Sequence, residues 1–173
     1  MKRFLFLSIF AIVTASLVAP ASAATSTNIS GHWKESYPKS GPPDCFTGSP
    51  CGIGELSPYG SAAEAFAFGG SDGFDANGCE HTHGTTTITL ADSAQSSFET
   101  NEVDTSCHPG NSQNTAGGLH SYGHPYTFTG TWSLVPESGT GIFSSACGGS
   151  GEASGNFAGS TGIIHYVGAL SFC

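Results

Sequence analysis

Two histidines with a spacing suited to metal binding lie near the middle of the chain. His81 and His83 are two residues apart in a threonine-rich stretch, and residues two apart in a β-strand project from the same face. Two imidazoles on one face form half of a metal site. The residues opposite them in a hairpin would be Thr105 and Val103, which are poor ligands. We therefore expect exposed histidines and no bound metal at this place.

Carboxylates gather near the same stretch. Glu80, Glu102 and Asp104 fall on the face opposite the two histidines, with His108 just beyond. Clustered carboxylates suit a hard cation such as calcium, because such ions prefer oxygen ligands. Acids exposed to solvent at the rim of the sheet, without a bound ion, are the commoner arrangement. We expect this solvated rim for Glu80, Glu102 and Asp104.

A single carboxyl could do acid–base chemistry if it were buried beside apolar side chains, because burial would raise its pKa. Alternation places Glu64 on the same face as Phe66 and Phe68, so Glu64 is the candidate catalytic residue. The observation that decides the matter is whether an acid points into a pocket beside aromatic side chains. The acids in question are Glu35, Glu55, Glu64, Glu80, Glu102 and Asp104.

Other reactive residue types lack the setting that their chemistry needs. Residues 69–73 satisfy the G-x-S-x-G pattern of hydrolases, but no helix follows to form the elbow that exposes the serine. His120 and His124 flank a loop tripeptide without a third ligand, and His165 lies on the outer face of the last predicted strand. No cofactor motif is present.

The segment that carries His81 and His83 is predicted to form a β-hairpin closed by a disulfide. If residues 91–95 form a turn centred on Ser93, an antiparallel hairpin pairs residues whose numbers sum to twice 93, and Cys79 and Cys107 satisfy that sum. One face then carries the pairs Ile88/Phe98 and Thr86/Thr100, and the other Thr87/Glu99 and Thr89/Ser97. This is the pattern of a hairpin with one buried face.

The remaining cysteines predict two further disulfides. An exported chain with six cysteines is expected to form three bridges. We expect Cys45 and Cys51 to close a small loop, and Cys147 and Cys173 to tie the last strand to an earlier one.

The beginning of the chain predicts export. Residues 1–23 combine a basic start, an apolar run and the small residues Ala21-Ser22-Ala23, which is the pattern of a signal peptide. We expect a secreted protein, periplasmic if the host has an outer membrane, with no membrane insertion after cleavage. Residues 24–173 carry two lysines, no arginine and 13 acidic residues, a net charge of 2 minus 13, or −11. Such a chain repels nucleic acid.

Residues 24–173 are expected to form a single all-β domain. Apolar residues alternate with polar ones over 126–134 and again over 164–172. Residues 136–139 and 148–151 look like turn segments, while 38–60 and 108–125 are expected to be long loops. The predicted topology is an antiparallel meander, which must close into a barrel or pack as a sandwich to cover its apolar face.

The stretch from Gly139 to Gly148, GTGIFSSACG, resembles an element of the allene oxide cyclase and dirigent barrels. It is also similar, in order and spacing over residues 79–158, to a group of small exported bacterial proteins. The resemblance implies a barrel of about eight antiparallel strands whose lumen can hold a small apolar molecule. In this element Gly139 and Gly141 permit a tight turn and close backbone approach, and Phe143 enters the core. Dirigent-type arginines have no counterpart in the mature chain.

Two functions follow from these observations. The first is a non-catalytic binding or protective module for a small apolar ligand, because no convergent catalytic group, nucleophile or cofactor motif stands out. The second is a cofactor-free isomerase or cyclase that acts on a hydrophobic substrate in the lumen. The sequence favours the first and leaves the oligomeric state open.

Overall fold

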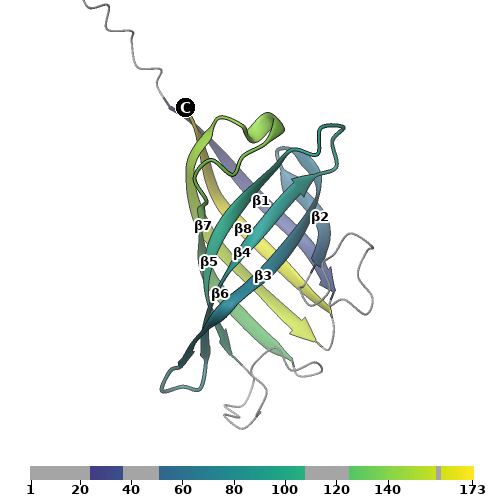
Figure 1. Cartoon of the computed structure of the whole chain (residues 1–173). Helices are drawn as coiled ribbons and strands as arrows, with labels where there is room; N and C mark the ends of the chain where they lie inside the picture. Colours follow the sequence, from purple (N-terminus) through teal and green to yellow (C-terminus); the bar gives the residue numbers. More distant parts are fainter. Residues whose placement is uncertain (1–23, 37–50, 108–124, 159–160) are drawn as a thin grey trace, which may run out of the picture.

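Eight antiparallel strands follow one another in chain order and close into a barrel (Figure 1). The computed structural model describes residues 24–36, 51–107, 125–158 and 161–173. The predicted signal peptide, Cys45, His108, His120 and His124 lie outside these ranges, as do residues 38–50 and 108–124 of the two predicted loops. The elements are β1 (Thr25–Ser36), β2 (Cys51–Ser57), β3 (Gly60–Phe74), β4 (Glu80–Leu90), β5 (Ser97–Cys107), β6 (Tyr126–Leu134), the 3-10 turn η1 (Gly141–Phe143), β7 (Ala146–Ala158) and β8 (Thr161–Phe172).

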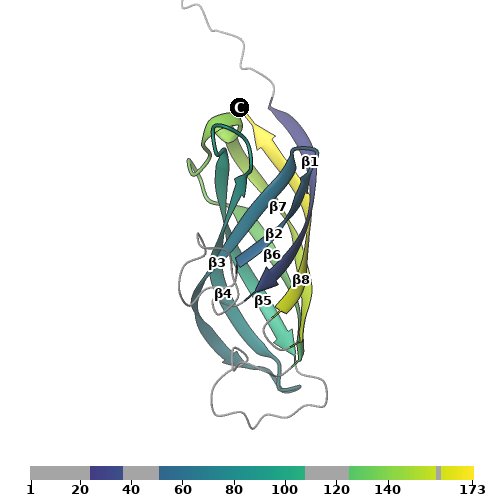
Figure 2. The ribbon, with the colours of Figure 1, turned by 90° about the vertical axis from the view of Figure 1, so that its right-hand side faces the viewer.

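Pairing of the first strand with the last decides between a barrel and a sandwich. β1 pairs with β8 along its whole length, from Thr25 opposite Phe172 to Ser36 opposite Thr161, and it also pairs with β2. No strand of the ring therefore has a free edge along these pairings, which is the closure that removes the edge-strand problem. The strands wrap around one common axis when seen from the side (Figure 2).

The predicted register of the central hairpin is confirmed. Ile88 pairs with Phe98, Thr86 with Thr100, and the ladder continues to Glu80 opposite Ser106. The face with Ile88 and Phe98 is buried, and both side chains have no exposed surface. The assumed turn at Ser93 and the positions of Cys79 and Cys107 predicted this register, and alternation agrees with it, because a slip of one residue would turn every apolar side chain outward.

Two segments predicted as loop or turn are strands instead. Cys51–Ser57 is β2, although prolines on both sides indicated a loop, and residues 148–151 lie inside β7. Packing explains three glycines of β7, namely Gly149, Gly151 and Gly155: a Cβ on Gly151, for example, would overlap the carbonyl oxygen of Val167 and lie 2.7 Å from Cε2 of Trp132. They make room for a large neighbour, as glycines inside strands often do.

The GTGxF element closes one end of the barrel, and it has the tight turn and the buried Phe143 that its glycines and phenylalanine predict. Gly141 has a φ of 55°, and a Cβ there would overlap Ser96, while Gly139 lies against the backbone of Phe143. The ring of Phe143 is fully buried and meets Phe98 edge-on at 4.8 Å. In Figure 1, η1 lies at the same end as the C-terminus. A Cβ on Gly148 would meet only Ser171, at 3.9 Å, so packing does not require glycine there.

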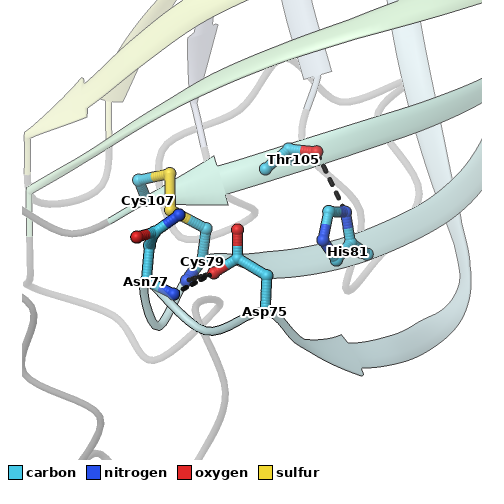
Figure 3. The surroundings of a disulfide bond; sticks show 6 residues. All are labelled: Asp75, Asn77, Cys79, His81, Thr105 and Cys107. Atoms are coloured by element: carbon cyan, nitrogen blue, oxygen red, sulfur yellow. Dashed lines mark hydrogen bonds between the residues drawn. A yellow bond between two sulfur atoms is a disulfide. The ribbon is translucent and has the colours of Figure 1, made fainter.

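Disulfides join strands at both ends of the barrel. Cys79 bonds to Cys107, with 4.4 Å between their Cα atoms, and Cys147 bonds to Cys173. Asp75 shapes the turn before the first bridge, because its carboxylate accepts hydrogen bonds from the backbone N–H groups of Asn77 and Cys79 (Figure 3). Cys51 is also disulfide-bonded. No helix within the described ranges is long and apolar enough to span a membrane.

The Cys79–Cys107 bridge should contribute strongly to stability. It closes a loop of 28 residues, and the chain-entropy relation gives a loss of about 3 to 4 kcal/mol when both cysteines become alanine. Urea denaturation of the C79A/C107A variant measures the loss. The control replaces an outward pair of the same hairpin, T87A/E99A, which should cost less than about 1 kcal/mol. A cysteine variant as stable as this control would contradict the expectation.

Candidate acid–base site in the barrel lumen

Four acidic side chains line a pocket in the lumen, away from the end closed by η1. They come from three strands: Glu35 from β1, Glu64 from β3, and Glu102 with Asp104 from β5. Each continues the inward-facing row of its strand, because Glu35 follows Trp33 by two residues and Glu102 follows Thr100 by two. All four are buried, with exposures between 2% and 6%.

Small residues on the neighbouring strands leave room for these carboxyls. Gly52 of β2 pairs with Glu35 on one side and with Glu64 on the other, so the two acids flank a residue without a side chain. A Cβ on Gly52 would lie 2.9 Å from Oε1 of Glu64. Gly130 plays the same part opposite Asp104, where a Cβ would overlap Oδ1. Glycine on the adjacent strands thus makes a place for acids inside the barrel.

The four acids line one pocket together with aromatic side chains. Its volume of about 40 Å³ holds only a few water molecules. Trp33 and Trp132 pack against Tyr166 of the pocket wall, at ring distances of 5.4 and 6.3 Å. The lining residues are Glu35, Glu64, Phe66, Thr82, Thr86, Glu102, Asp104, Ser106, Phe128, Phe157, Ile164 and Tyr166.

Hydrogen bonds satisfy only part of the cluster. The hydroxyl of Thr100 donates to Oε1 of Glu102 at 3.3 Å, and the hydroxyl of Tyr166 donates to Thr86 at 3.1 Å. Among the described residues, Oε1 of Glu64 and Oδ1 of Asp104 have no hydrogen-bond partner, although both atoms are buried. A buried polar atom without a partner costs free energy and calls for a functional reason.

Burial raises the pKa of all four acids. Desolvation raises the pKa of Glu35 to about 7, against a hydrogen bond with Glu64 that lowers it. Desolvation raises the pKa of Asp104 to about 6. The pKa values of Glu64 and Glu102 lie well above their ordinary value, first through desolvation and then through a neighbouring acid, Glu35 or Asp104 respectively. These four carboxyl groups therefore keep their protons at pH values at which exposed acids are ionised.

No basic residue compensates the acids within the described lining of the pocket. The described part of the chain also contains no group of three or more histidine, cysteine or acidic side chains placed to hold a metal ion. The four acids can donate and accept protons inside a narrow pocket with apolar walls.

The expected solvated rim of Glu80, Glu102 and Asp104 is wrong. Their exposures are 4%, 4% and 6%. The face assignment itself was correct, because all three share the face of Phe98 and Thr100. The error was to treat one end of that face as surface, whereas ring closure makes the whole face a lumen.

The structure places Glu64 beside Phe66 in the pocket, but Phe68 is 47% exposed. The pairing of β3 with β4 shifts between Phe68 and Gly70, and such an irregularity ends the simple alternation. Glu35 becomes the partner of Glu64. Its place two residues after Trp33 was the sequence signal that could have singled it out.

The four described histidines, His32, His81, His83 and His165, lie on the outer surface. His81 contacts the hydroxyl of Thr105 at 3.0 Å (Figure 3), and His83 contacts Asp72 at 3.1 Å. His165 faces outward as expected, with its Nδ1 3.1 Å from Nδ1 of His32. Residues 69–73 remain within strand β3, and no helix follows them.

The fold and this site define a small closed antiparallel barrel with an acidic, aromatic lumen. We compared the chain with models of protein families, with curated proteins and with solved structures, and found no match. The chemistry of the lumen itself therefore indicates the function.

Proposed function

We propose that the protein is a cofactor-free isomerase or cyclase that moves a proton on a small substrate in the lumen of the barrel. The observation that carries this proposal is the buried pair Glu35 and Glu64, which faces a pocket with aromatic walls. Carboxyls with strongly raised pKa values in a pocket are candidates for a functional site.

The pair has the protonation states that such a reaction needs. A general acid or base works best when its pKa lies near the working pH, and the pKa of Glu35 is about 7. Ionised Glu35 accepts a proton from a C–H group, and protonated Glu64 donates one elsewhere on the same substrate. Glu35 then releases its proton to water and Glu64 takes one from water, which restores the starting state and leaves the elemental composition of the substrate unchanged.

A second candidate is the non-catalytic binding or protection of a small apolar molecule. The observation in its favour is the apolar part of the wall, formed by Phe66, Phe128, Phe157 and Ile164. Both functions use the same pocket, and they differ in whether the bound molecule is changed.

We further propose that the protein works outside the cytoplasm and is related to the allene oxide cyclase and dirigent barrels. Disulfides form and persist in oxidising compartments, and the two described bridges support this location. The position of the GTGxF element at one end of an eight-stranded barrel supports the relationship.

Incubation with a small-molecule extract of the source organism in D₂O tests the proposed activity. We expect the native protein to convert at least one compound into an isomer that carries one deuterium, as detected by liquid chromatography with mass spectrometry. Because Glu64→Gln and Glu35→Gln remove the proton transfers, neither variant should form it. Glu55→Gln changes the same charge on the exposed face of β2 and should behave as the native protein.

A folded Glu64→Gln variant that forms the product as fast as the native protein would contradict the assignment of the site. A compound that is retained by the barrel but never converted would support the binding function instead. Circular dichroism of each variant shows that the barrel is intact.

A further inference from the structure

The charges around the pocket are all of one kind. Its described lining contains Glu35, Glu64, Glu102 and Asp104, and no lysine, arginine or histidine. Among the described residues, Tyr166 is the only other titratable group that lines it. Glu80 adds a further buried acid on the lumenal face of β4. An anionic substrate would meet repulsion as soon as any of these carboxyls ionised, whereas a cation would be attracted.

We propose that the substrate or ligand of the lumen carries a protonated amine, which displaces a proton from the carboxyl cluster when it binds. This inference rests on the proposed function of the lumen as a ligand site, and it names the chemical class of the ligand.

The atom that carries the inference furthest is Oε1 of Glu64. Glu64 is 2% exposed and lines the pocket, and no described residue donates a hydrogen bond to this oxygen. Oδ1 of Asp104, on the strand two places away in the sheet order, lacks a donor as well. An ammonium group has three N–H donors and no acceptor, so it supplies what these two oxygens lack.

The aromatic side chains fit the same ligand class. Phe66, Phe128, Phe157 and Tyr166 line the pocket together with the acids. The face of an aromatic ring attracts a cation, and the attraction grows when water is excluded. Carboxyls and aromatic rings with no basic residue among them form a site for an organic cation. The small volume of the pocket, about 40 Å³, favours a primary amine on an unbranched chain.

Binding must be coupled to proton release. Because the carboxyls hold protons near neutral pH, the ammonium ion meets a carboxylic acid and not a carboxylate. The carboxyl loses its proton to the solvent, and the resulting carboxylate pairs with the ammonium ion, so charge and atoms balance. Affinity should therefore rise as the pH increases, up to the point where the amine itself loses its proton, at a pH of about 10.

Three probes of equal chain length and different charge test the inference on the native protein. Ligand-observed NMR titrations give the dissociation constants for butylammonium, 1-butanol and butyrate at pH 6 and pH 8. We expect butylammonium to bind at least about tenfold more tightly than 1-butanol, as a charge-assisted contact implies, and butyrate not to bind. Its affinity should be higher at pH 8, and a pH indicator in weak buffer should report acid released on binding.

Variants separate the lumen from the acidic surface of the protein. Glu64→Gln and Asp104→Asn should each weaken butylammonium binding by about tenfold or more. Glu55→Gln removes the same charge from the outer surface and should leave the binding unchanged. Two inner variants are used so that a folding defect in one of them does not decide the result.

The outcomes distinguish this inference from the proposed function. If 1-butanol binds as tightly as butylammonium, or if Glu55→Gln weakens binding as much as Glu64→Gln, the amine preference is overturned and the lumen can still be catalytic. If no probe binds while the protein converts a compound from the extract, the ligand class is wrong and the activity stands. If butylammonium binds as described but no compound is converted, the ligand class stands and the catalytic function fails.

Discussion

The free energy of unfolding is expected to fall as the pH rises from about 4 to about 7. The reason is the buried acid cluster. The pKa of Glu35 is raised to about 7 and that of Asp104 to about 6 in the folded protein, whereas unfolding returns both to ordinary values near 4. Between these limits the folded state holds protons that the unfolded state has released, so each rise in pH favours unfolding.

The size of the effect follows from the same linkage. Each group costs about 1.4 kcal/mol per pH unit within its window. The stabilising contribution is fully present below the unfolded pKa, and it is lost as the pH rises through the folded pKa. The pKa values of Glu64 and Glu102 are raised by burial as well, so these two acids add to the fall. A decrease of several kcal/mol is therefore expected between pH 4 and pH 7, which is a large part of the stability of a domain of this size.

Exposed acids set the lower limit of the stable range. Hydrogen bonds from Cys79 lower the pKa of Asp75, and hydrogen bonds from Ser96 lower that of Asp92. Their contribution is present above their unfolded pKa and is lost as the pH falls through the folded one. Maximum stability is thus expected near pH 4.

Urea denaturation at pH 4, 5, 6 and 7 measures this dependence. Glu35→Gln should flatten the curve, because glutamine keeps the shape of a protonated carboxyl and cannot ionise. The variant should also be more stable than the native protein at pH 7. Glu55→Gln, on the outer surface, should leave the curve unchanged. Stability that is constant or rises between pH 5 and pH 7 would show that the acids are not buried in protonated form.

Phe143→Ala should destabilise the protein by about 3 to 5 kcal/mol, which is the usual cost of removing a buried phenylalanine ring. Phe143 has no exposed surface and packs edge-on against Phe98 and Tyr59, at ring distances of 4.8 and 4.9 Å. Its loss leaves a cavity at the end of the barrel that η1 closes, and the surrounding rings cannot fill it without moving the strands.

The matched control is the preceding residue. Ile142 belongs to the same turn but is 53% exposed, so Ile142→Ala should change the free energy of unfolding by less than about 0.5 kcal/mol. Thermal and urea denaturation of the two variants at pH 5 compare them directly. Equal losses would mean that the turn stabilises the barrel through its backbone, and that the ring of Phe143 does not act as a plug.

Local patterns in the sequence determined much of the fold. The hairpin of β4 and β5, its register and its disulfide follow from alternation and from the positions of Cys79 and Cys107. The strands β6 and β8 follow from alternation as well. The turn of the GTGxF element follows from two glycines and one phenylalanine. These features depend on contacts between residues close in the chain or on a period of two, so a single sequence contains enough information to place them.

The local sequence did not predict β2 and part of β7, because these segments are strands only through packing against their neighbours. β2 has a glycine at each second position near its start, and the strand β7 contains four glycines within 148–155. Glycine has weak intrinsic strand preference, so local propensity indicates turns at both places. What makes them strands is the space required by large side chains on the next strands, such as Trp132 beside Gly151. That requirement exists only after the strands have paired.

The site was decided by ring closure. Sequence alternation predicted that Glu102 and Asp104 share one face and that Glu64 shares a face with Phe66. The local sequence does not indicate whether such a face is exposed to solvent or lines the lumen. Pairing of β1 with β8 turns one face of all the strands inward. The pairing of β2 with β1 and with β3 places Glu35 and Glu64 on either side of Gly52 on that inner face. In an isolated strand these carboxyl groups would stay in water. Once the sheet has closed they are buried, and for this reason the acidic pocket exists only in the tertiary structure.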